Sequence, residues 1–238
     1  MSVAQMEQLI SSANYALRVR SYVIRSGKMS DAQKRSYDDL FPLYGRRQEE
    51  IGAIDSRVLF GNGSPMTVEI GFGMGRATAE IAENNPGMNY LGIEVHRPGI
   101  GRLLWEIEKR KLQNIRIIEG DASEIIEKSL AINNVAAFHI FFPDPWPKKR
   151  HHKRRLITRP FTDLLASRLV PDGYIYAVSD WADYGTWMLR ELSTTTMLVN
   201  KYGSYAEPQS WRPITEFEKK AHKAGLETRE LFFLKESK

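Results

Sequence analysis

The sequence predicts an α/β fold: a doubly wound, mostly parallel sheet of seven strands, preceded by an N-terminal helical extension. Three observations predict it. From Met66 onward, short apolar segments alternate with helical segments. A glycine-rich turn joins the first apolar segment directly to a helix, and acidic residues end the next two strands. The chain has 238 residues, of which 42% are hydrophobic, so one large domain is the expected size.

Hydrophobic periodicity gives the approximate limits of each element. We expect strands at residues 67–70, 89–95, 115–119, 136–142 and 173–179, with a last strand inside 227–234. We expect helices near residues 76–85, 99–111, 122–130, 161–169 and 182–192. The regular order of strand and helix is typical of a parallel sheet with crossover helices.

The first 60 residues differ from the remainder, so we divide the chain into an extension (1–60) and a main domain (61–238). The extension is polar, has little strand character, and is expected to hold one or two short helices. Its basic residues are Arg18, Arg20, Arg25, Lys28, Lys34, Arg35, Arg46 and Arg47.

Composition limits the possible chemistry. The chain has no cysteine, which excludes disulfides, thiolate metal sites and cysteine nucleophiles. No segment resembles a secretion signal or a membrane span, so we expect a cytoplasmic protein that does not enter membranes. The net charge of +5 permits, but does not require, binding to a phosphate-rich partner.

The first predicted strand runs into a turn that contains Gly71, Gly73 and Gly75. Glycines allow a tight turn and a close approach of the backbone to a ligand. The spacing is Gly-x-Gly-x-Gly, whereas a dinucleotide site favours Gly-x-Gly-x-x-Gly. Glu69 lies two positions before the first glycine. A tight strand-to-helix connection without a ligand remains the alternative for the turn taken alone.

Two more acidic residues follow predicted strands, at the edge where open α/β sheets bind ligands. Glu94 ends the second strand, where a carboxylate can accept hydrogen bonds from both ribose hydroxyls of an adenosyl group. Asp121 follows the third strand and can accept a hydrogen bond from an adenine amino group, with the Ala122 backbone nearby. An ordinary helix N-cap is the alternative for Asp121.

A rigid loop with three prolines follows the fourth strand, and it places Asp144 beside the carboxyl end of the first strand. Alone, Asp144 would be interpreted as a turn residue. Nine basic residues come directly after this loop, with no acidic residue between Pro145 and Thr162, which favours binding to RNA phosphates over a merely solvated face. They are Lys148, Lys149, Arg150, His151, His152, Lys153, Arg154, Arg155 and Arg159. The two histidines lack carboxylate partners, so we expect no metal site.

These segments together resemble the bacterial tRNA (guanine-N7)-methyltransferases. The similarity is carried by residues 69–75 (EIGFGMG), 92–96 (GIEVH), 142–151 (FPDPWPKKRH) with 153–155 (KRR), and 212–218 (RPITEFE). The first segment is common to many methyltransferases, while the proline-tryptophan loop and the late Thr-x-Phe-Glu segment are specific to this family. The resemblance therefore implies a Rossmann-like, S-adenosylmethionine-dependent methyltransferase.

The resemblance also implies roles for individual residues. Glu69, Glu94, Asp121 and Asp144 would line the donor site with Gly71, Gly73, Gly75 and Ala122, and Asp144 would be catalytic. Lys148, Asp180, Thr215, Glu216, Phe217 and Glu218 would contact the substrate, and residues 149–155 would meet RNA together with the basic extension. By spacing alone, Thr215 and Glu218 would be interpreted as a helix-capping box.

The implied reaction methylates N7 of guanine 46 in the variable loop of tRNA and leaves S-adenosylhomocysteine. Guanine N7 has a free lone pair, so catalysis should consist mainly of alignment and charge stabilisation. Asp144 and Asp180 can accept hydrogen bonds from the N–H groups at guanine N1 and N2. Adenine lacks both of these donors. Trp146 or Trp181 could stack on the base, although both could equally be structural anchors. We expect no obligatory protein partner, and either a monomer or a homodimer.

Two other functions remain open at this point. The first is a methyltransferase of the same fold that acts on an exocyclic amine of a base, on a protein or on a small molecule. The second is a non-catalytic RNA-binding protein that has kept the fold. The basic segment disfavours protein and small-molecule substrates, and the complete set of strand-end acids disfavours loss of catalysis.

Overall fold

The computed structural model describes residues 20–23, 27–223, 225 and 227–237. The helices are α2 (Asp31–Tyr44), α3 (Ser56–Phe60), α4 (Arg76–Asn84), α5 (Arg97–Arg110), α6 (Ala122–Ser129), α7 (Arg159–Arg168), α8 (Ala182–Ser193) and α9 (Glu216–Lys223), with short 3-10 helices η2 (Gln48–Glu50) and η3 (Lys149–Arg154). The strands are β1 (Gly45–Arg47), β2 (Met66–Ile70), β3 (Asn89–Glu94), β4 (Ile115–Glu119), β5 (Val135–Phe141), β6 (Leu169–Ser179), β7 (Leu198–Asn200) and β8 (Arg229–Lys235).

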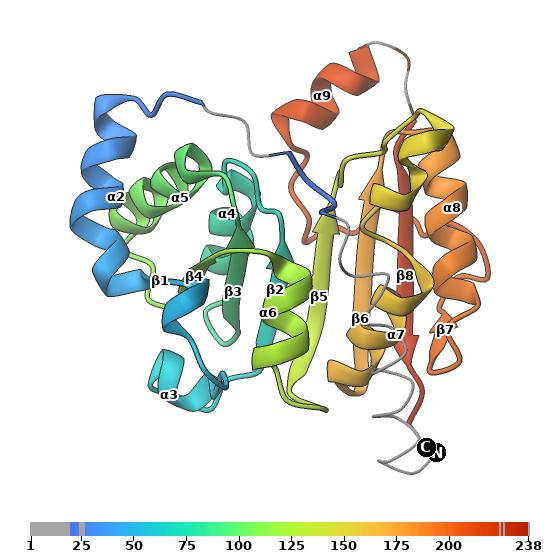
Figure 1. Ribbon diagram of the computed structural model, residues 1–238, viewed down its shortest axis with the longest axis horizontal. Coiled ribbons are helices and arrows are strands. Elements are labelled where there is room, and N and C mark those ends of the chain that lie inside the picture. Colours follow the sequence, from blue (N-terminus) through green and yellow to red (C-terminus); the bar gives the residue numbers. More distant parts are fainter. Residues whose placement is uncertain (1–19, 24–26, 224, 226, 238) are drawn as a thin grey trace.

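The strands form one mostly parallel sheet in the order β1-β4-β3-β2-β5-β6-β8-β7 (Figure 1). Among the strands of the described residues, the pairs β6–β8 and β7–β8 are antiparallel and the other pairs are parallel. The central strand β2 pairs with β3 on one side and with β5 on the other. The strands β3 and β4 thus lie on one side of β2, and the strands β5 and β6 lie on the other. This reversal of the strand order opens a crevice at the carboxyl ends of β2 and β5, which is the usual ligand position in such sheets.

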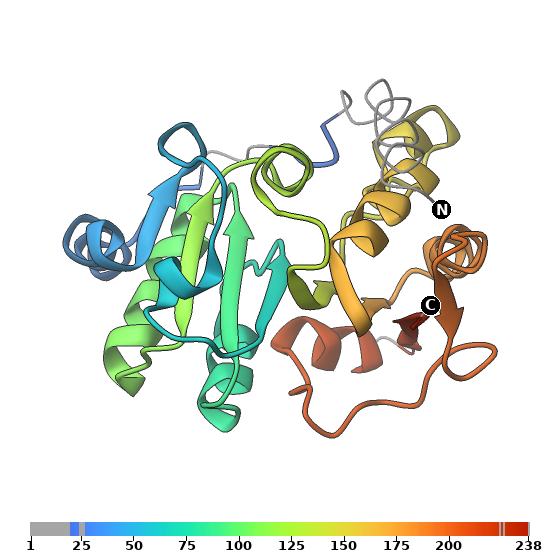
Figure 2. The ribbon, with the colours of Figure 1, turned by 90° about the horizontal axis from the view of Figure 1, so that it is seen from below.

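Helices cover both faces of this sheet, as the view from below shows (Figure 2). One face packs against α3, α6, α7 and α8 through a core that includes Phe60, Ile126 and Phe161. The other face packs against α2, α4 and α5 through a core that includes Phe41, Ile81 and Leu103. Each such side chain contributes about 1.5–3 kcal/mol when it is fully buried. The doubly wound architecture predicted from the sequence is confirmed.

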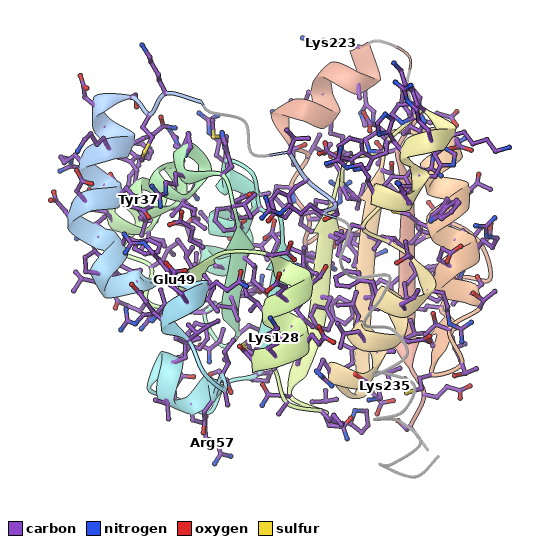
Figure 3. The ribbon with its side chains drawn as sticks, in the orientation of Figure 1. Tyr37, Glu49, Arg57, Lys128, Lys223 and Lys235 are labelled. Atoms are coloured by element: carbon purple, nitrogen blue, oxygen red, sulfur yellow. The ribbon has the colours of Figure 1, made fainter. Side chains whose placement is uncertain are left out.

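Within the described residues, the sheet has eight strands rather than the seven expected, and β1 forms one edge of it, parallel to β4. β1 has only three residues, too few for a hydrophobic period to be detected. α2 begins with a capping box of Ser30 and Gln33, and the Gln33 side chain also donates to the Pro98 carbonyl at 3.0 Å. Tyr37, labelled in Figure 3, donates from α2 to Glu119 at the end of β4.

The division expected at residue 60 stays a sequence prediction, but the packing is continuous across it. Ile54 and Phe60 belong to the same hydrophobic core as β2 and β5, and Phe41 belongs to the core of the opposite face. The described part of the extension is therefore integrated with the sheet. Arg18 and Arg25 lie outside the described residues.

Among the described residues, no helix combines the length and the apolar character needed to cross a membrane.

Candidate functional site

A cavity of about 370 Å³ opens at the carboxyl ends of the central strands. Four elements expected from the sequence line it: the glycine turn after β2, the end of β3, the start of α6 and the loop after β5. A fifth, unexpected element is the segment Ser21–Val23. The lining includes Ser21, Tyr22, Val23, Gly71, Gly73, Glu94, Val95, His96, Gly120, Ala122, Phe142, Pro143 and Asp144.

The glycine turn has the backbone geometry that its sequence predicts. Gly71, Gly73 and Gly75 have φ of 72°, 56° and 66°, values that L side chains rarely adopt. A Cβ on Gly71 or Gly73 would meet nothing within 4 Å, so this part of the turn is open to a ligand. A Cβ on Gly75 would lie 2.6 Å from the Leu103 Cβ. Gly75 therefore permits helix packing instead of lining the cavity.

The Glu94 carboxylate lines the cavity and is held by three backbone N–H groups. Its Oε2 accepts from Gly73 at 2.9 Å, and its Oε1 accepts from Val95 at 2.7 Å and from His96 at 3.0 Å. These bonds fix the carboxylate and join β3 to the glycine turn. The side chain is 8% exposed, so its remaining acceptor capacity is directed at the cavity.

Glu69 lies beneath the glycine turn rather than in the cavity wall. It is buried at 3% exposure, and its Oε2 has no hydrogen-bond partner among the described residues. Burial raises the pKa of Glu69 to about 7, and the charge of Glu94 adds to the increase. A buried carboxyl group with a raised pKa therefore lies next to the glycine turn in sequence, outside the cavity lining.

Asp121 caps α6, which confirms the alternative interpretation of this residue. Its Oδ1 accepts from Ser123 at 2.9 Å and from Glu124 at 3.3 Å. The cap uses one carboxylate oxygen and leaves the other available. Ala122, which follows directly, lines the cavity as expected. A helix cap and a ligand contact are therefore compatible at Asp121.

The proline-tryptophan loop brings Asp144 to the cavity mouth. Phe142 has φ of 52°, an uncommon value for a non-glycine residue, and its N–H donates to the Val178 carbonyl at 2.8 Å. This bond fastens the start of the loop to β6. Asp144 is exposed and lines the same cavity as the glycine turn. The loop therefore contributes a carboxylate to the cavity that Gly71 and Glu94 also line.

The basic segment after this loop folds into the 3-10 helix η3, which the sequence did not predict. Lys148, Lys149, Arg150 and Lys153 are exposed, whereas His151, His152 and Arg154 are half-buried. Desolvation and the surrounding cations lower the pKa of His151. A short helical turn thus concentrates positive charge on one surface beside the cavity.

Arg155 must be removed from the expected set of RNA contacts, because its guanidinium is used inside the protein. It is 2% exposed, donates from Nε to the Pro145 carbonyl at 3.0 Å, and pairs with Asp183. Its charge also lies 4.8 Å from the Trp187 ring centre. Arg155 therefore joins the proline-tryptophan loop to the start of α8.

Glu218 likewise has no free carboxylate to offer a substrate. It is 2% exposed, and both of its oxygens accept from Arg212 at 2.7 Å. Arg212 also pairs with the buried Glu230. The Thr215 hydroxyl accepts from the Glu218 N–H at 3.1 Å, so the capping-box interpretation is confirmed. The side chains of Glu216 and Phe217 lie outside the described part of the chain.

Asp180 and Trp181 follow the end of β6, next to the proline-tryptophan loop. Asp180 is half-buried, and Trp181 is 42% exposed. Trp146 differs, because its Nε1 donates to the Ser21 carbonyl at 2.9 Å and the Arg154 guanidinium lies 4.2 Å from its ring centre. The two tryptophans therefore differ in their surroundings, a distinction that their sequence positions did not reveal.

Sequence reasoning missed the contribution of Ser21–Val23 and the anchoring roles of Arg155 and Arg212. Arg212 is the first residue of the segment 212–218, but no feature of the neighbouring sequence indicated that it pairs with Glu218. Within the described ranges, no group of three or more histidine, aspartate or glutamate residues is arranged to hold a metal ion.

Comparisons with known proteins agree with this geometry. A family model described as "Putative methyltransferase" matches residues 63–231. A Nitrosomonas europaea protein named tRNA (guanine-N(7)-)-methyltransferase is 46% identical over 216 residues, which cover 90% of this chain and 96% of that protein. A Treponema pallidum protein of the same name is 55% identical over 172 residues, covering 72% of this chain and 68% of that protein.

Solved structures share the fold at low sequence identity. The 16S rRNA methyltransferase KamB has a TM-score of 0.51 and 13% identity, covering 92% of this chain and 99% of its own. The antibiotic-resistance methyltransferase Kmr has a TM-score of 0.52 and 13% identity, covering 78% and 95%. At this identity, these likenesses support the Rossmann-like fold alone.

Proposed function

Since the chain belongs to the family of tRNA (guanine-N(7)-)-methyltransferases, we propose that it transfers a methyl group from S-adenosyl-L-methionine to N7 of guanine 46 in the variable loop of tRNA. The observation that carries the proposal is one cavity shared by the open glycine turn, Glu94 and Asp144, with an exposed cationic turn beside it.

The residues present fit an adenosyl methyl donor. The cavity volume of about 370 Å³ lies in the range of small-molecule sites. Gly71 and Gly73 leave backbone accessible where a side chain would fill the turn. Glu94 is fixed to accept hydrogen bonds from ribose hydroxyls, and Asp121 keeps one carboxylate oxygen for an adenine amino group. When bound, the donor supplies a sulfonium-activated methyl group.

Asp144 and Asp180 select and hold the guanine in this proposal. A carboxylate can accept the N–H groups at guanine N1 and N2, and adenine would leave it without those partners. The same negative charge stabilises the positive charge that develops on the purine when N7 attacks the methyl group. No base is needed to deprotonate N7, so these residues position the ring and do not remove a proton from it.

Trp181 is the aromatic residue that we assign to stacking on the extruded base. It is exposed and follows Asp180 directly, whereas Trp146 is held by Ser21 and Arg154. Stacking on one base is worth about 1–3 kcal/mol. Trp181→Ala should therefore raise the KM for tRNA about fivefold or more, while Trp181→Phe should restore most of the affinity. Equal KM values in all three proteins would remove Trp181 from the base pocket.

The tRNA backbone contacts the exposed cations of η3 and its flank. Lys148, Lys149, Arg150 and Lys153 lie together on the surface beside the cavity, with no acidic residue between positions 145 and 162. Such a cluster releases counterions when phosphate binds, which makes affinity depend on salt. The proposed contact surface also includes the basic N-terminal extension, as expected from the sequence.

A direct test incubates the protein with methyl-labelled donor and unmodified tRNA, and then identifies the labelled nucleoside and its position by mass spectrometry. We expect 7-methylguanosine at position 46. Label in N6-methyladenosine would indicate an amine methyltransferase instead, and label at another guanine would contradict only the assigned position. Absence of transfer with intact tRNA binding would favour a non-catalytic RNA-binding protein.

A further inference from the structure

The segment Ser21–Val23 forms a wall of the cavity that sequence motifs do not assign to it. These residues share the cavity with Glu94 and Asp144 although they lie far from both in sequence. In Figure 1 the dark blue segment of residues 20–23 lies beside the carboxyl end of β5. The N-terminal extension, expected only to contact RNA, therefore reaches the proposed donor site.

Two side chains from the RNA-facing region hold this segment by its backbone. Trp146 donates from Nε1 to the Ser21 carbonyl at 2.9 Å, and Arg154 donates from Nε to the Arg20 carbonyl at 3.3 Å. Arg154 also lies over the Trp146 ring at 4.2 Å, a favourable cation–π distance. The main chain at residues 20 and 21 is thus fixed against the proline-tryptophan loop, which places Tyr22 in the cavity.

Tyr22 lies in the cavity wall close to the residue expected to recognise adenine. Its side chain is half-buried, and it lines the cavity together with Gly120 and Ala122, the two chain neighbours of Asp121. Burial and the negative charge of Asp121 raise the pKa of Tyr22, so its hydroxyl stays protonated. Because the Asp121 cap on α6 uses Oδ1, the other carboxylate oxygen can accept a hydrogen bond from a ligand that lies beside Tyr22.

We propose that Tyr22 is a binding residue for the adenine end of the methyl donor and that Trp146 is a positioning residue that holds it there. This assignment rests on the proposed function, because the ligand is the donor of that reaction. The Tyr22 ring packs against the adenine in the part of the cavity that Gly120 and Ala122 also line, and its hydroxyl adds a polar group close to Asp121. The indole of Trp146 acts only through the Ser21 carbonyl.

The proposal is tested by the affinity for S-adenosylhomocysteine, measured by calorimetry with the full chain. Tyr22→Phe removes the polar hydroxyl from the adenine end of the cavity and should raise the Kd about three- to tenfold. Tyr22→Ala also removes the ring that packs against the adenine, so its Kd should rise by more than about tenfold. Tyr202→Phe removes a hydroxyl from an exposed loop tyrosine outside the cavity lining and should leave the Kd unchanged.

Trp146→Phe keeps a ring beneath Arg154 but removes the donor to Ser21, and it should raise the Kd about threefold or more. Combining it with Tyr22→Ala should add little, because both changes act through one segment. tRNA affinity without donor should change less than twofold in Tyr22→Ala, a separation that general destabilisation would not produce. Wild-type donor affinity in Tyr22→Ala, or full additivity of the two changes, would overturn the proposal.

The same titrations separate this proposal from the proposed function. If the wild-type protein binds S-adenosylhomocysteine but forms no 7-methylguanosine, the tRNA assignment is wrong. The role of Tyr22 is then still tested by the Kd values of the Tyr22 variants. If the wild-type protein does not bind S-adenosylhomocysteine, the donor site and the role of Tyr22 are rejected together. Unfolding in urea checks that Tyr22→Ala is folded, and Tyr22→Phe provides the conservative comparison.

Discussion

Replacing Glu69 by glutamine should remove a pH dependence from methyl-donor binding. Glu69 is buried beneath the glycine turn, and burial raises its pKa to about 7 with a contribution from Glu94. A positive charge nearby favours the ionised carboxyl group. The donor carries positive charge at its sulfonium and amino groups, so its binding should lower the pKa of Glu69 and release a proton.

The size of this effect follows from the pKa of Glu69. If the donor binds the ionised form, the competent fraction is about 0.1 at pH 6 and about 0.9 at pH 8, so affinity should rise about tenfold, or about 1.4 kcal/mol. Glutamine cannot titrate and should flatten this part of the profile. The donor's own titration affects both proteins equally and therefore cancels in the comparison.

The raised pKa of Glu69 also makes the stability of the protein depend on pH. The folded-state pKa is about 7, above the ordinary value of 4.5 for a glutamate, so between these values the native state holds a proton that the unfolded state has lost. Stability contributed by the protonated Glu69 is therefore present below about pH 4.5 and is lost as pH rises to 7, by about 3 kcal/mol in total. The free energy of unfolding of Glu69→Gln should not show this decrease with pH.

The assay is titration calorimetry with S-adenosylmethionine at pH 6, 7 and 8, in two buffers that differ in ionisation heat. Wild-type protein should release close to one proton on binding at pH 6 and progressively less at higher pH, whereas Glu69→Gln should release none from this site. Urea unfolding of both proteins at pH 5 and pH 8 checks the stability change. Parallel affinity profiles in the two proteins would refute the assignment of Glu69 as the titrating group.

Three further changes test other parts of the site. Asp144→Asn should lower kcat at least about a hundredfold while tRNA affinity stays within about twofold, because the carboxylate charge acts on the developing purine cation; near-normal kcat would exclude a catalytic role. The triple change of Lys149, Arg150 and Lys153 to Gln should weaken tRNA binding and reduce the slope of log affinity against log salt by up to about 3; an unchanged slope would move the RNA surface elsewhere. Gly75→Ala should lower the free energy of unfolding by about 2–4 kcal/mol, because it combines an unfavourable φ with a clash against Leu103; a loss below about 1 kcal/mol in urea unfolding would contradict the packing argument.

Much of the fold could be predicted because its signals are local. The strands at residues 67–70 and 115–119 and the helix that follows Gly75 were located within a residue or two by hydrophobic periodicity and glycine placement. β1 and β7 were not located, since three residues carry no usable period and each strand is defined by pairing with a distant partner. The short 3-10 helix η3 was not predicted either, because its six residues are all basic and carry no hydrophobic period.

The site was predictable where a residue acts through its position on a strand. Glu94 and Asp144 line the cavity because the carboxyl ends of parallel strands meet at one edge. Arg155 and Glu218 could not be assigned in this way, because their charges are neutralised by Asp183 and Arg212, and those pairings depend on tertiary packing. A charged residue in a functional motif can thus be a structural anchor.

A crystal structure with bound S-adenosylhomocysteine tests the central claim most directly. We expect the adenosyl group in the cavity beside Tyr22, with its ribose hydroxyls on Glu94, its adenine amino group on Asp121 and its sulfur facing Asp144. Ligand bound elsewhere, or a cavity left without ligand while these carboxylates point to solvent, would contradict it.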